Sequence, residues 1–192
     1  MTLRNLACTF ALLAASAASA ALKAGDAAPA FIAPASLAGK PFTYSLQEGL
    51  AKGPVVVYFY PSAYTAGCNI QAHEFSTKAD RFAAAGASVI GVSLDSIERL
   101  NAFSADPDYC AGKLAVASDG DGRIARAFGL RVSGPQAGAI DTRGKEIDHG
   151  FTERTTFVVK RDGTILAAVG GVSPEANVAR ALELVQKLAA AR

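Results

Sequence analysis

The sequence predicts a single α/β domain with a mixed central sheet flanked by helices, and three observations support this class. Short runs of β-branched and aromatic residues alternate with helical patterns along most of the chain. The last two strand-like runs enclose a tight turn signal, which favours an antiparallel hairpin beside parallel strands. The length of 192 residues suits one hydrophobic core and leaves no room for a second domain.

The first part of the domain is predicted to be irregular, and the core begins after it. Residues 24–39 are rich in proline, alanine and glycine, which predicts a loose leading segment with a short edge strand. Residues 54–60, with the sequence PVVVYFY, form a continuous β-branched and aromatic run that Pro61 ends. Such a run is typical of a strand buried on both faces, so we expect it to be the central strand.

A helix follows this strand, because apolar or small residues recur at steps of four and three. Polar residues, Gln71 among them, fall on the rest of the helix surface. The positions that share the inward face are Cys68, Ala72, Phe75, Ala79 and Phe82. Cys68 therefore lies at the start of the helix.

Two further pairs of strand and helix complete the alternation. Residues 88–93 form a strand, and Asp95 caps the helix that follows, which runs to about Ser104. Residues 114–118 form the next strand.

Asp119 then caps a short helix that closes at Gly129. Residues 131–150 are rich in glycine, proline and other breakers, so we expect a loop with a ragged hairpin.

The chain ends with a hairpin and a long amphipathic helix. Residues 155–160 and 164–169 are strand-like and flank the turn Arg161-Asp162-Gly163. Ser173, Pro174 and Glu175 open the last helix, whose inward positions are Val178, Leu182, Val185 and Leu188. This order of elements fits a thioredoxin-like fold.

The first twenty residues have the pattern of a cleaved secretory signal peptide. Arg4 supplies the positive charge, residues 6–15 the apolar stretch, and Ala18-Ser19-Ala20 the cleavage site. This stretch is shorter than a membrane span, and Cys8 comes too early for a lipoprotein signal. We therefore expect a mature domain of residues 21–192, exported to the bacterial periplasm, where disulfides persist.

The charge balance argues against two kinds of partner. The 19 basic and 17 acidic residues give a net charge of +2, without a dense basic run. Neither a nucleic acid nor stable membrane association is expected. A small molecule or a protein thiol fits better.

The candidate reactive residue lies where the first buried strand is followed by a helix. Cys68 lies at this helix start, and the carboxyl end of a parallel strand is a favoured place for ligand sites. A thiolate is the reactive form of cysteine, and a helix N-terminus stabilises an anion. A cysteine at such a position is otherwise a small buried hydrophobe, so its neighbours must decide between the two interpretations.

The neighbours favour reactivity, because the segment resembles the peroxiredoxin signature of proline, three residues, threonine, two residues and cysteine. Here the three positions are Pro61, Thr65 and Cys68. The resemblance implies that Cys68 is the peroxidatic cysteine, that the Thr65 hydroxyl bonds the thiolate and the peroxide, and that Pro61 shelters the pocket. Residues 153–159 resemble the family's later strand and imply a catalytic role for Arg154, whose permanent charge favours a thiolate.

The resemblance extends over nearly all of the mature chain and is strongest to the bacterioferritin-comigratory-protein subgroup. It implies a thiol-dependent peroxidase that reduces hydrogen peroxide and organic hydroperoxides in antioxidant defence. The sulfenic acid formed on Cys68 is then reduced by a thioredoxin-like or other thiol donor. No cofactor is implied, and the cysteines and histidines lack the short spacings of a zinc site.

One departure from the subgroup concerns the resolving cysteine. Many members carry it five residues after the peroxidatic one, where this chain has His73, and others carry it where this chain has Ser104. Cys110 lies six residues beyond Ser104 and is the candidate that remains. Its alternatives are an inert buried thiol and a cysteine that pairs between subunits. Because the preceding helix should carry it away from Cys68, we expect that resolution would require local unfolding.

Three other functions fit parts of the sequence. A thiol–disulfide exchange module would need a cysteine at the position of Gln71, and a glutathione-peroxidase-like enzyme would need a tryptophan, which the chain lacks. An exported binding module without activity would not need the set of Pro61, Thr65, Cys68 and Arg154. For the assembly we expect a monomer or a weak dimer.

Overall fold

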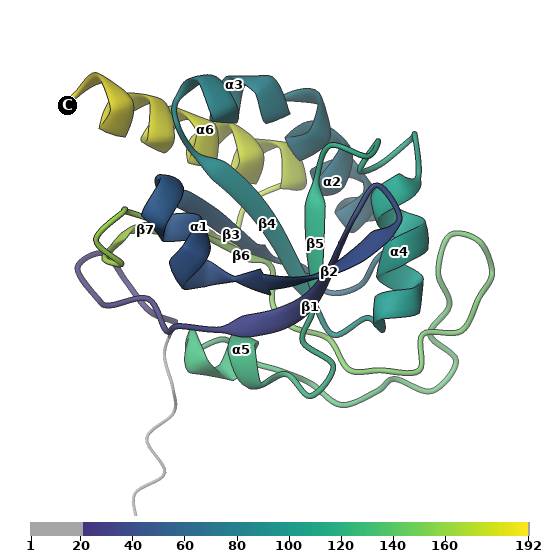
Figure 1. Ribbon diagram of the computed structural model, residues 1–192. Coiled ribbons are helices and arrows are strands. Elements are labelled where there is room, and N and C mark those ends of the chain that lie inside the picture. The colour runs from purple at the N-terminus through teal and green to yellow at the C-terminus, as the bar shows by residue number, and fades with distance from the viewer. Residues whose placement is uncertain (1–20, 192) are drawn as a thin grey trace, which may run out of the picture.

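The computed structural model describes residues 21–191 (Figure 1), so the predicted signal peptide and Cys8 lie outside the described part of the chain. One mixed sheet of seven strands runs in the order β2-β1-β5-β4-β3-β6-β7, with helices on both faces. This arrangement confirms the predicted fold class. The strands are β1 (Ile32–Leu37), β2 (Lys40–Ser45), β3 (Val55–Phe59), β4 (Ser88–Ser93), β5 (Ala115–Ser118), β6 (Thr155–Val159) and β7 (Ile165–Gly170).

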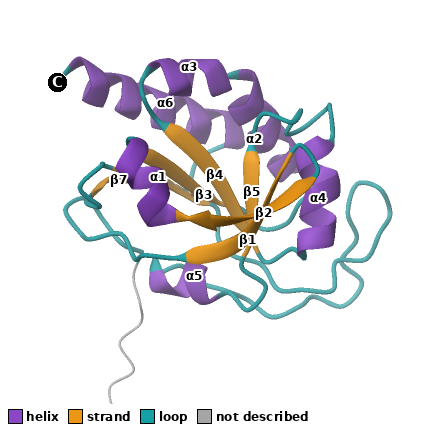
Figure 2. Cartoon of the chain, viewed as in Figure 1, coloured by secondary structure: helices purple, strands orange, loops and turns teal. Residues whose placement is uncertain are grey.

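The helices divide into two layers (Figure 2), which pack against two separate sets of core residues. Within residues 21–191 no helix is long and apolar enough to cross a membrane. The helices on one face are α2 (Ala66–Thr77), α3 (Ala79–Ala84), α4 (Ile97–Ala105) and α6 (Pro174–Ala190), and those on the other are α1 (Leu46–Lys52) and α5 (Arg123–Ala127).

Strand β3 explains why the two layers stay together. Each of its residues is buried, because successive side chains point to opposite faces and both faces are covered. Val56 and Tyr58 join the core under α2 and α6, whereas Val57 and Phe59 join the core under α1 and α5. The strand lies between β4, which is parallel, and β6, which is antiparallel. β4 rather than β3 occupies the middle of the sheet.

The leading segment is more regular than the sequence predicts. Strands β1 and β2 form an antiparallel hairpin, and β1 also pairs with β5, so the loose segment contributes two strands. Helix α1 is absent from the prediction, and Ser45 caps it by accepting a bond from the backbone N–H of Glu48. The short run between Ser45 and the buried strand carries only weak apolar periodicity, which explains the omission.

Two helix boundaries also differ from the prediction. The helix that Cys68 opens breaks at Lys78 into α2 and α3. Asp95 does not cap α4, because Ser96 does so by accepting a hydrogen bond from the backbone N–H of Arg99. The N-cap of α5 is Gly122 and not Asp119, but the Asp119 carboxylate still accepts from two backbone N–H groups of the first turn.

The remaining predicted elements agree with the structure. Residues 131–150 form a loop with isolated bridges, such as the one between Ile140 and Glu146. The turn 161–163 joins β6 to β7, and Ser173 caps α6. Leu188, predicted to point inward, is only half-buried near the end of that helix.

Candidate active site

Cys68 lies at the third position of α2, directly beyond the carboxyl end of β3. Its side chain is buried and belongs to the core under α2 and α6. The α2 dipole places partial positive charge within this first turn, where it favours a negatively charged sulfur. The sequence therefore predicted the position of the thiol correctly, both at the start of a helix and beyond the carboxyl end of the strand before it.

Arg154 reaches the same point from a distant part of the chain. Strand β6 pairs antiparallel with β3, and Thr155 stands opposite Phe59, so the residue before β6 lies where β3 ends. Nη2 of Arg154 donates a hydrogen bond to Sγ of Cys68 at 3.3 Å. Gly67 makes room for this approach, since a Cβ atom there would lie 3.1 Å from Nη2.

Gln71 also contacts the arginine, contrary to its predicted place on the outer surface of the helix. Its side chain is fully buried, and its Oε1 accepts a hydrogen bond from Nη1 of Arg154. A buried polar side chain requires partners, and Arg154 and Asn177 supply them here. The guanidinium is thus held on both sides, by the sulfur and by an amide.

Thr65 and Pro61 complete the loop between β3 and α2. The hydroxyl of Thr65 donates to the carbonyl of Ser62 at 2.8 Å and not to Sγ of Cys68, which differs from what the family resemblance implies. Its lone pairs remain available to accept a hydrogen bond. Thr65 also precedes the first residue of α2 as its N-cap, without a capping bond from its side chain. Pro61 is half-buried immediately after Tyr60.

Asp95 holds this loop in place through hydrogen bonds. Its carboxylate is buried and accepts from the Ser62 hydroxyl at 2.9 Å and from the Ala63 backbone N–H at 2.8 Å. A third bond, 2.7 Å long, comes from the hydroxyl of Ser93 at the end of β4. The residue predicted to cap α4 therefore ties the Cys68 loop to the neighbouring strand.

His149, in the loop that precedes β6, belongs to the same cluster. Its Nε2 lies 2.9 Å from a carboxylate oxygen of Asp95, and its Nδ1 donates to the carbonyl of Gly150 at 2.7 Å. Burial opposes the charged form, but the hydrogen bond and charge of Asp95 outweigh it and raise the pKa of His149. Burial likewise opposes ionisation of Asp95, yet the bonds from His149, Ser93 and Ala63 hold its pKa below the usual range.

A second carboxylate links the long loop to the same region. Arg99 pairs with Asp95 through Nε and with Asp141 through Nη2, both at 2.8 Å. Burial alone would raise the pKa of Asp141, but bonds from the Lys145 backbone and from Arg143 lower it to about 2. Ion pairs through Arg99 therefore connect loop 131–150 to Asp95, the residue that holds the Cys68 loop.

Tyr64 marks the sharpest bend in the Cys68 loop. Its φ angle of 62° lies in the left-handed region, which is uncommon for an aromatic residue. The backbone N–H and the hydroxyl of Thr142 both donate to the Tyr64 carbonyl at 2.8 Å. The ring packs on Phe103 and lies beneath the guanidinium of Arg143. These contacts hold a backbone conformation that the sequence alone does not favour.

Cys110, the candidate resolving cysteine, lies in the segment between α4 and β5. It is fully buried in the turn formed by residues 106–113, and both thiols are free. The turn is fastened to α2 because His73 donates to the carbonyl of Asp108 and Ser76 donates to that of Tyr109. These anchors lie roughly one to two helical turns beyond Cys68. Burial, followed by the charge of Asp106, raises the pKa of the Cys110 thiol.

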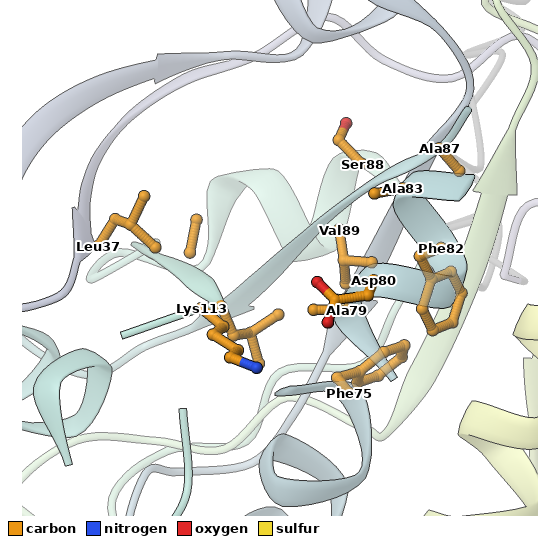
Figure 3. A pocket seen from close by; sticks show the side chains of 12 residues that line it. Leu37, Phe75, Ala79, Asp80, Phe82, Ala83, Ala87, Ser88, Val89 and Lys113 are labelled. Atoms are coloured by element: carbon orange, nitrogen blue, oxygen red, sulfur yellow. The ribbon is translucent and has the colours of Figure 1, made fainter. Parts of the chain in front are cut away.

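A mainly apolar cavity of about 470 Å³ lies elsewhere, at the other end of β4 (Figure 3). Phe75 and Phe82 form one wall, and Val89 from β4 points into it. Ligand sites of such sheets lie at the carboxyl ends of the parallel strands, whereas this cavity lies where β4 begins. It contains neither Cys68 nor Arg154 and is not part of the candidate site.

Sequence reasoning missed three buried polar residues around the thiol: Gln71, Asp95 in its actual role, and Asn177. A signal was available for Asn177, because this amide interrupts the inward apolar stripe of α6 directly before Val178. A buried polar residue requires a partner, so such an interruption indicates a network.

Comparison with known proteins places the chain among enzymes that use a reactive cysteine. The model of the AhpC/TSA family matches residues 24–168. Peroxiredoxin Bcp of Escherichia coli strain K12 is 33% identical over 144 residues, which cover 75% of this chain and 83% of that protein.

Solved structures agree with this likeness. Peroxidoxin BcpB from Mycobacterium tuberculosis superposes with a TM-score of 0.71 at 29% identity, over 87% of this chain and 98% of that one. The bacterioferritin comigratory protein of Xanthomonas campestris, whose alkyl peroxide reduction activity that structure addresses, superposes with a TM-score of 0.64 at 28% identity. The match covers 81% of this chain and 91% of that one.

Proposed function

Because the chain belongs to the AhpC/TSA family of peroxiredoxins and is a thiol-dependent peroxidase, we propose that Cys68 is the cysteine that reacts with the peroxide. The observation that supports this role most directly is the bond from Arg154 to the sulfur at the N-terminus of α2. Both the guanidinium and the helix dipole stabilise a thiolate. An inactive binding module has no need of either.

The reaction proceeds as a displacement at oxygen. The thiolate of Cys68 attacks the hydroxyl oxygen of the hydroperoxide, an S–O bond forms, and the O–O bond breaks. The sulfur becomes a sulfenic acid, and the leaving alkoxide or hydroxide takes a proton from solvent to give an alcohol or water. Arg154 stabilises the negative charge that grows on the departing oxygen, because its own charge is fixed in place.

The two other residues of the motif orient the peroxide. The Thr65 hydroxyl already donates its hydrogen to Ser62, so it can accept the hydrogen of the peroxide and aim the O–O bond at the sulfur. Pro61 has no N–H to attract water beside the thiol. Hydrogen peroxide and organic hydroperoxides are the substrates, and the alkyl peroxide activity of the Xanthomonas relative supports the second class.

The cycle closes when a thioredoxin-like or other thiol reduces the sulfenic acid. Internal resolution by Cys110 requires that turn 106–113 leave α2 and that the start of α2 unwind, since a disulfide needs Cα atoms within about 7 Å. Without that movement an external thiol attacks Cys68 directly. In either cycle the protein acts in antioxidant defence.

We further propose that residues 1–20 are a signal peptide and that the mature protein works in the bacterial periplasm as a monomer or a weak dimer. The charged start, apolar stretch and small-residue cleavage site support export. Expression of the full chain in a bacterium, followed by cell fractionation and intact mass measurement, tests this directly. A cytoplasmic protein that retains residues 1–20 would contradict it.

The role of Cys68 is tested by the intact mass of the reduced protein before and after one equivalent of hydrogen peroxide, with Cys68→Ser as the comparison. Loss of two hydrogens that the variant does not show means that Cys110 resolves Cys68. Gain of one oxygen on Cys68 means that an external thiol is needed. Oxidation at an unchanged rate in Cys68→Ser would rule out the proposed role.

A further inference from the structure

The Arg154 guanidinium has an unusual set of partners. One side donates to Sγ of Cys68 and the other to Oε1 of Gln71. None of the ion pairs within residues 21–191 includes Arg154. Gln71 is a neutral amide, so it aligns the guanidinium without cancelling its charge. The sulfur is then the acidic group that the guanidinium contacts directly.

Gln71 can hold Arg154 in only one of two orientations. Its side chain ends in an oxygen that accepts and a nitrogen that donates, and the two ends have nearly the same shape. A guanidinium only donates, so a flipped amide would place two donors face to face. Something must therefore select the orientation of Gln71.

Asn177 of α6 provides that selection. Its Oδ1 accepts a hydrogen bond from Nε2 of Gln71 at 2.9 Å. Its own Nδ2 donates to the backbone carbonyl of Val169 at 2.8 Å, and a carbonyl can only accept. Asn177 and Gln71 are fully buried, so water does not offer either amide an alternative partner.

The two amides thus form a chain between an obligatory acceptor, the Val169 carbonyl, and an obligatory donor, the Arg154 guanidinium. Only one pair of orientations satisfies each bond in the chain. The hydroxyl of Thr156 donates to the same Oδ1 at 2.5 Å. A flip of either amide would bury unpaired donors and acceptors, which is unfavourable.

We propose that Asn177 is a positioning residue for the peroxidase reaction, which it controls through Gln71 and Arg154. The inference rests on the proposed role of Cys68. Asn177 does not touch the sulfur or the peroxide. Its loss frees Gln71 to turn, and the guanidinium then loses its fixed place beside the thiolate and the leaving oxygen.

The test compares Asn177→Ala with Val178→Ala. Val178 is the next residue on α6 and equally buried, so its truncation disturbs the same packing without touching the amide chain. Two quantities are measured in the reduced full-length protein: the rate constant for oxidation of Cys68 by hydrogen peroxide, and the pH at which Cys68 is half alkylated by iodoacetamide in a fixed time. Circular dichroism reports the folded fraction.

In Asn177→Ala we expect the oxidation rate constant to fall about tenfold to a hundredfold, as for other displaced catalytic groups. The half-alkylation point should move to higher pH. Val178→Ala should keep both quantities near the wild-type values. Unchanged values in folded Asn177→Ala, or an equal loss in Val178→Ala, would overturn the proposal.

Further variants separate this role from folding and from the proposed function itself. Asn177→Leu retains the branched shape and packing but removes the amide, so it replaces Asn177→Ala if the alanine variant does not fold. Gln71→Met removes the amide that contacts Arg154 itself. This variant is used if neither Asn177→Ala nor Asn177→Leu folds. Failure of wild-type Cys68 to react with peroxide would refute the proposed function, whereas the alkylation measurement would still report on Asn177.

Discussion

Nη2 of Arg154 lies 3.3 Å from Sγ of Cys68, although 86 positions separate the two residues in the chain. The pairing of β3 with β6 brings them together, and Gly67 leaves the space in which they meet. The contact therefore depends on the register of β3 and β6, on the absence of a Cβ atom at Gly67, and on the side-chain amides that hold the guanidinium. Each of these dependences can be tested separately.

Two replacements of Arg154 test whether its positive charge is enough for activity or whether the planar guanidinium is also needed. Arg154→Met should lower the rate constant for peroxide reduction by about a hundredfold to a thousandfold, because it removes the donor from the growing negative charge. Arg154→Lys retains the charge but loses the planar fork that spans Cys68 and Gln71, so it should recover only part of this loss. Stopped-flow oxidation with hydrogen peroxide measures both. Equal rates in the lysine variant and the wild type would show that the fork is unnecessary.

Gly67→Ala should separate stability from activity. Alanine favours a helix by up to about 1 kcal/mol relative to glycine, so the free energy of unfolding should hold or rise. The new Cβ atom would press on Nη2 of Arg154, and peroxide reduction should fall about tenfold.

The matched control is Ala66→Gly, at the exposed first position of the same helix. It should reduce the free energy of unfolding and leave the rate constant nearly unchanged. Urea denaturation and the same kinetic assay compare the two variants. A Gly67→Ala protein of full activity would mean that Arg154 moves aside without consequence.

The pair of Asp95 and His149 predicts how stability depends on pH. The pKa of His149 is raised in the folded protein, so its contribution is complete below the unfolded value of about 6.5 and is lost as the pH rises through the folded pKa. The pKa of Asp95 is lowered, so its contribution is present above about 3.9 and is lost as the pH falls through the folded value. Together the two groups therefore contribute their full stability between about pH 3.9 and 6.5, the two unfolded values.

Urea denaturation at several pH values tests this window. Above the window the free energy of unfolding of the wild type should decline with pH, since neutral His149 retains its hydrogen on Nδ1 for Gly150 and turns a lone pair toward Asp95. In His149→Gln this decline should disappear. His73→Gln, at the other histidine of the described chain, should retain it. Identical slopes in the wild type and His149→Gln would contradict the prediction.

Access to Cys110 should depend on the bonds between α2 and the turn at 106–113. In the native protein we expect slow alkylation of Cys110, because the thiol is fully buried and burial raises its pKa. Ser76→Ala removes the bond to the Tyr109 carbonyl and should accelerate this alkylation, measured by mass spectrometry after digestion. Thr77→Ala, exposed on the same helix, serves as the control. An unchanged rate in Ser76→Ala would mean that another contact holds the turn.

Much of the scaffold could be predicted from local patterns. The buried run of β3, the cap Ser173 and the turn at 161–163 each depend on neighbours in sequence, and the structure has them as expected. The motif at 61–68 also located the thiol at a helix start. The hairpin of β1 and β2 was less visible, because β2 lies at the edge of the sheet and most of its residues are exposed.

The polar environment of the thiol could not be predicted from local pattern. From the sequence Gln71 is predicted to be a surface residue, and only the tertiary structure shows that it contacts Arg154. Asp95 is likewise predicted to be a helix cap, whereas in the structure its carboxylate accepts from Ser62 and Ser93. Such roles depend on tertiary neighbours that helical periodicity does not encode. The left-handed backbone of Tyr64 is a similar case, since contacts from a distant loop stabilise it.

The pairing of β6 with β3 also sets the order in which the enzyme becomes reactive during its own synthesis. A chain that has emerged only as far as Gly150 contains Cys68 and the helix around it, but neither the guanidinium nor Asn177. The guanidinium and the amide behind it therefore reach the thiol only when the last strands and the last helix have folded.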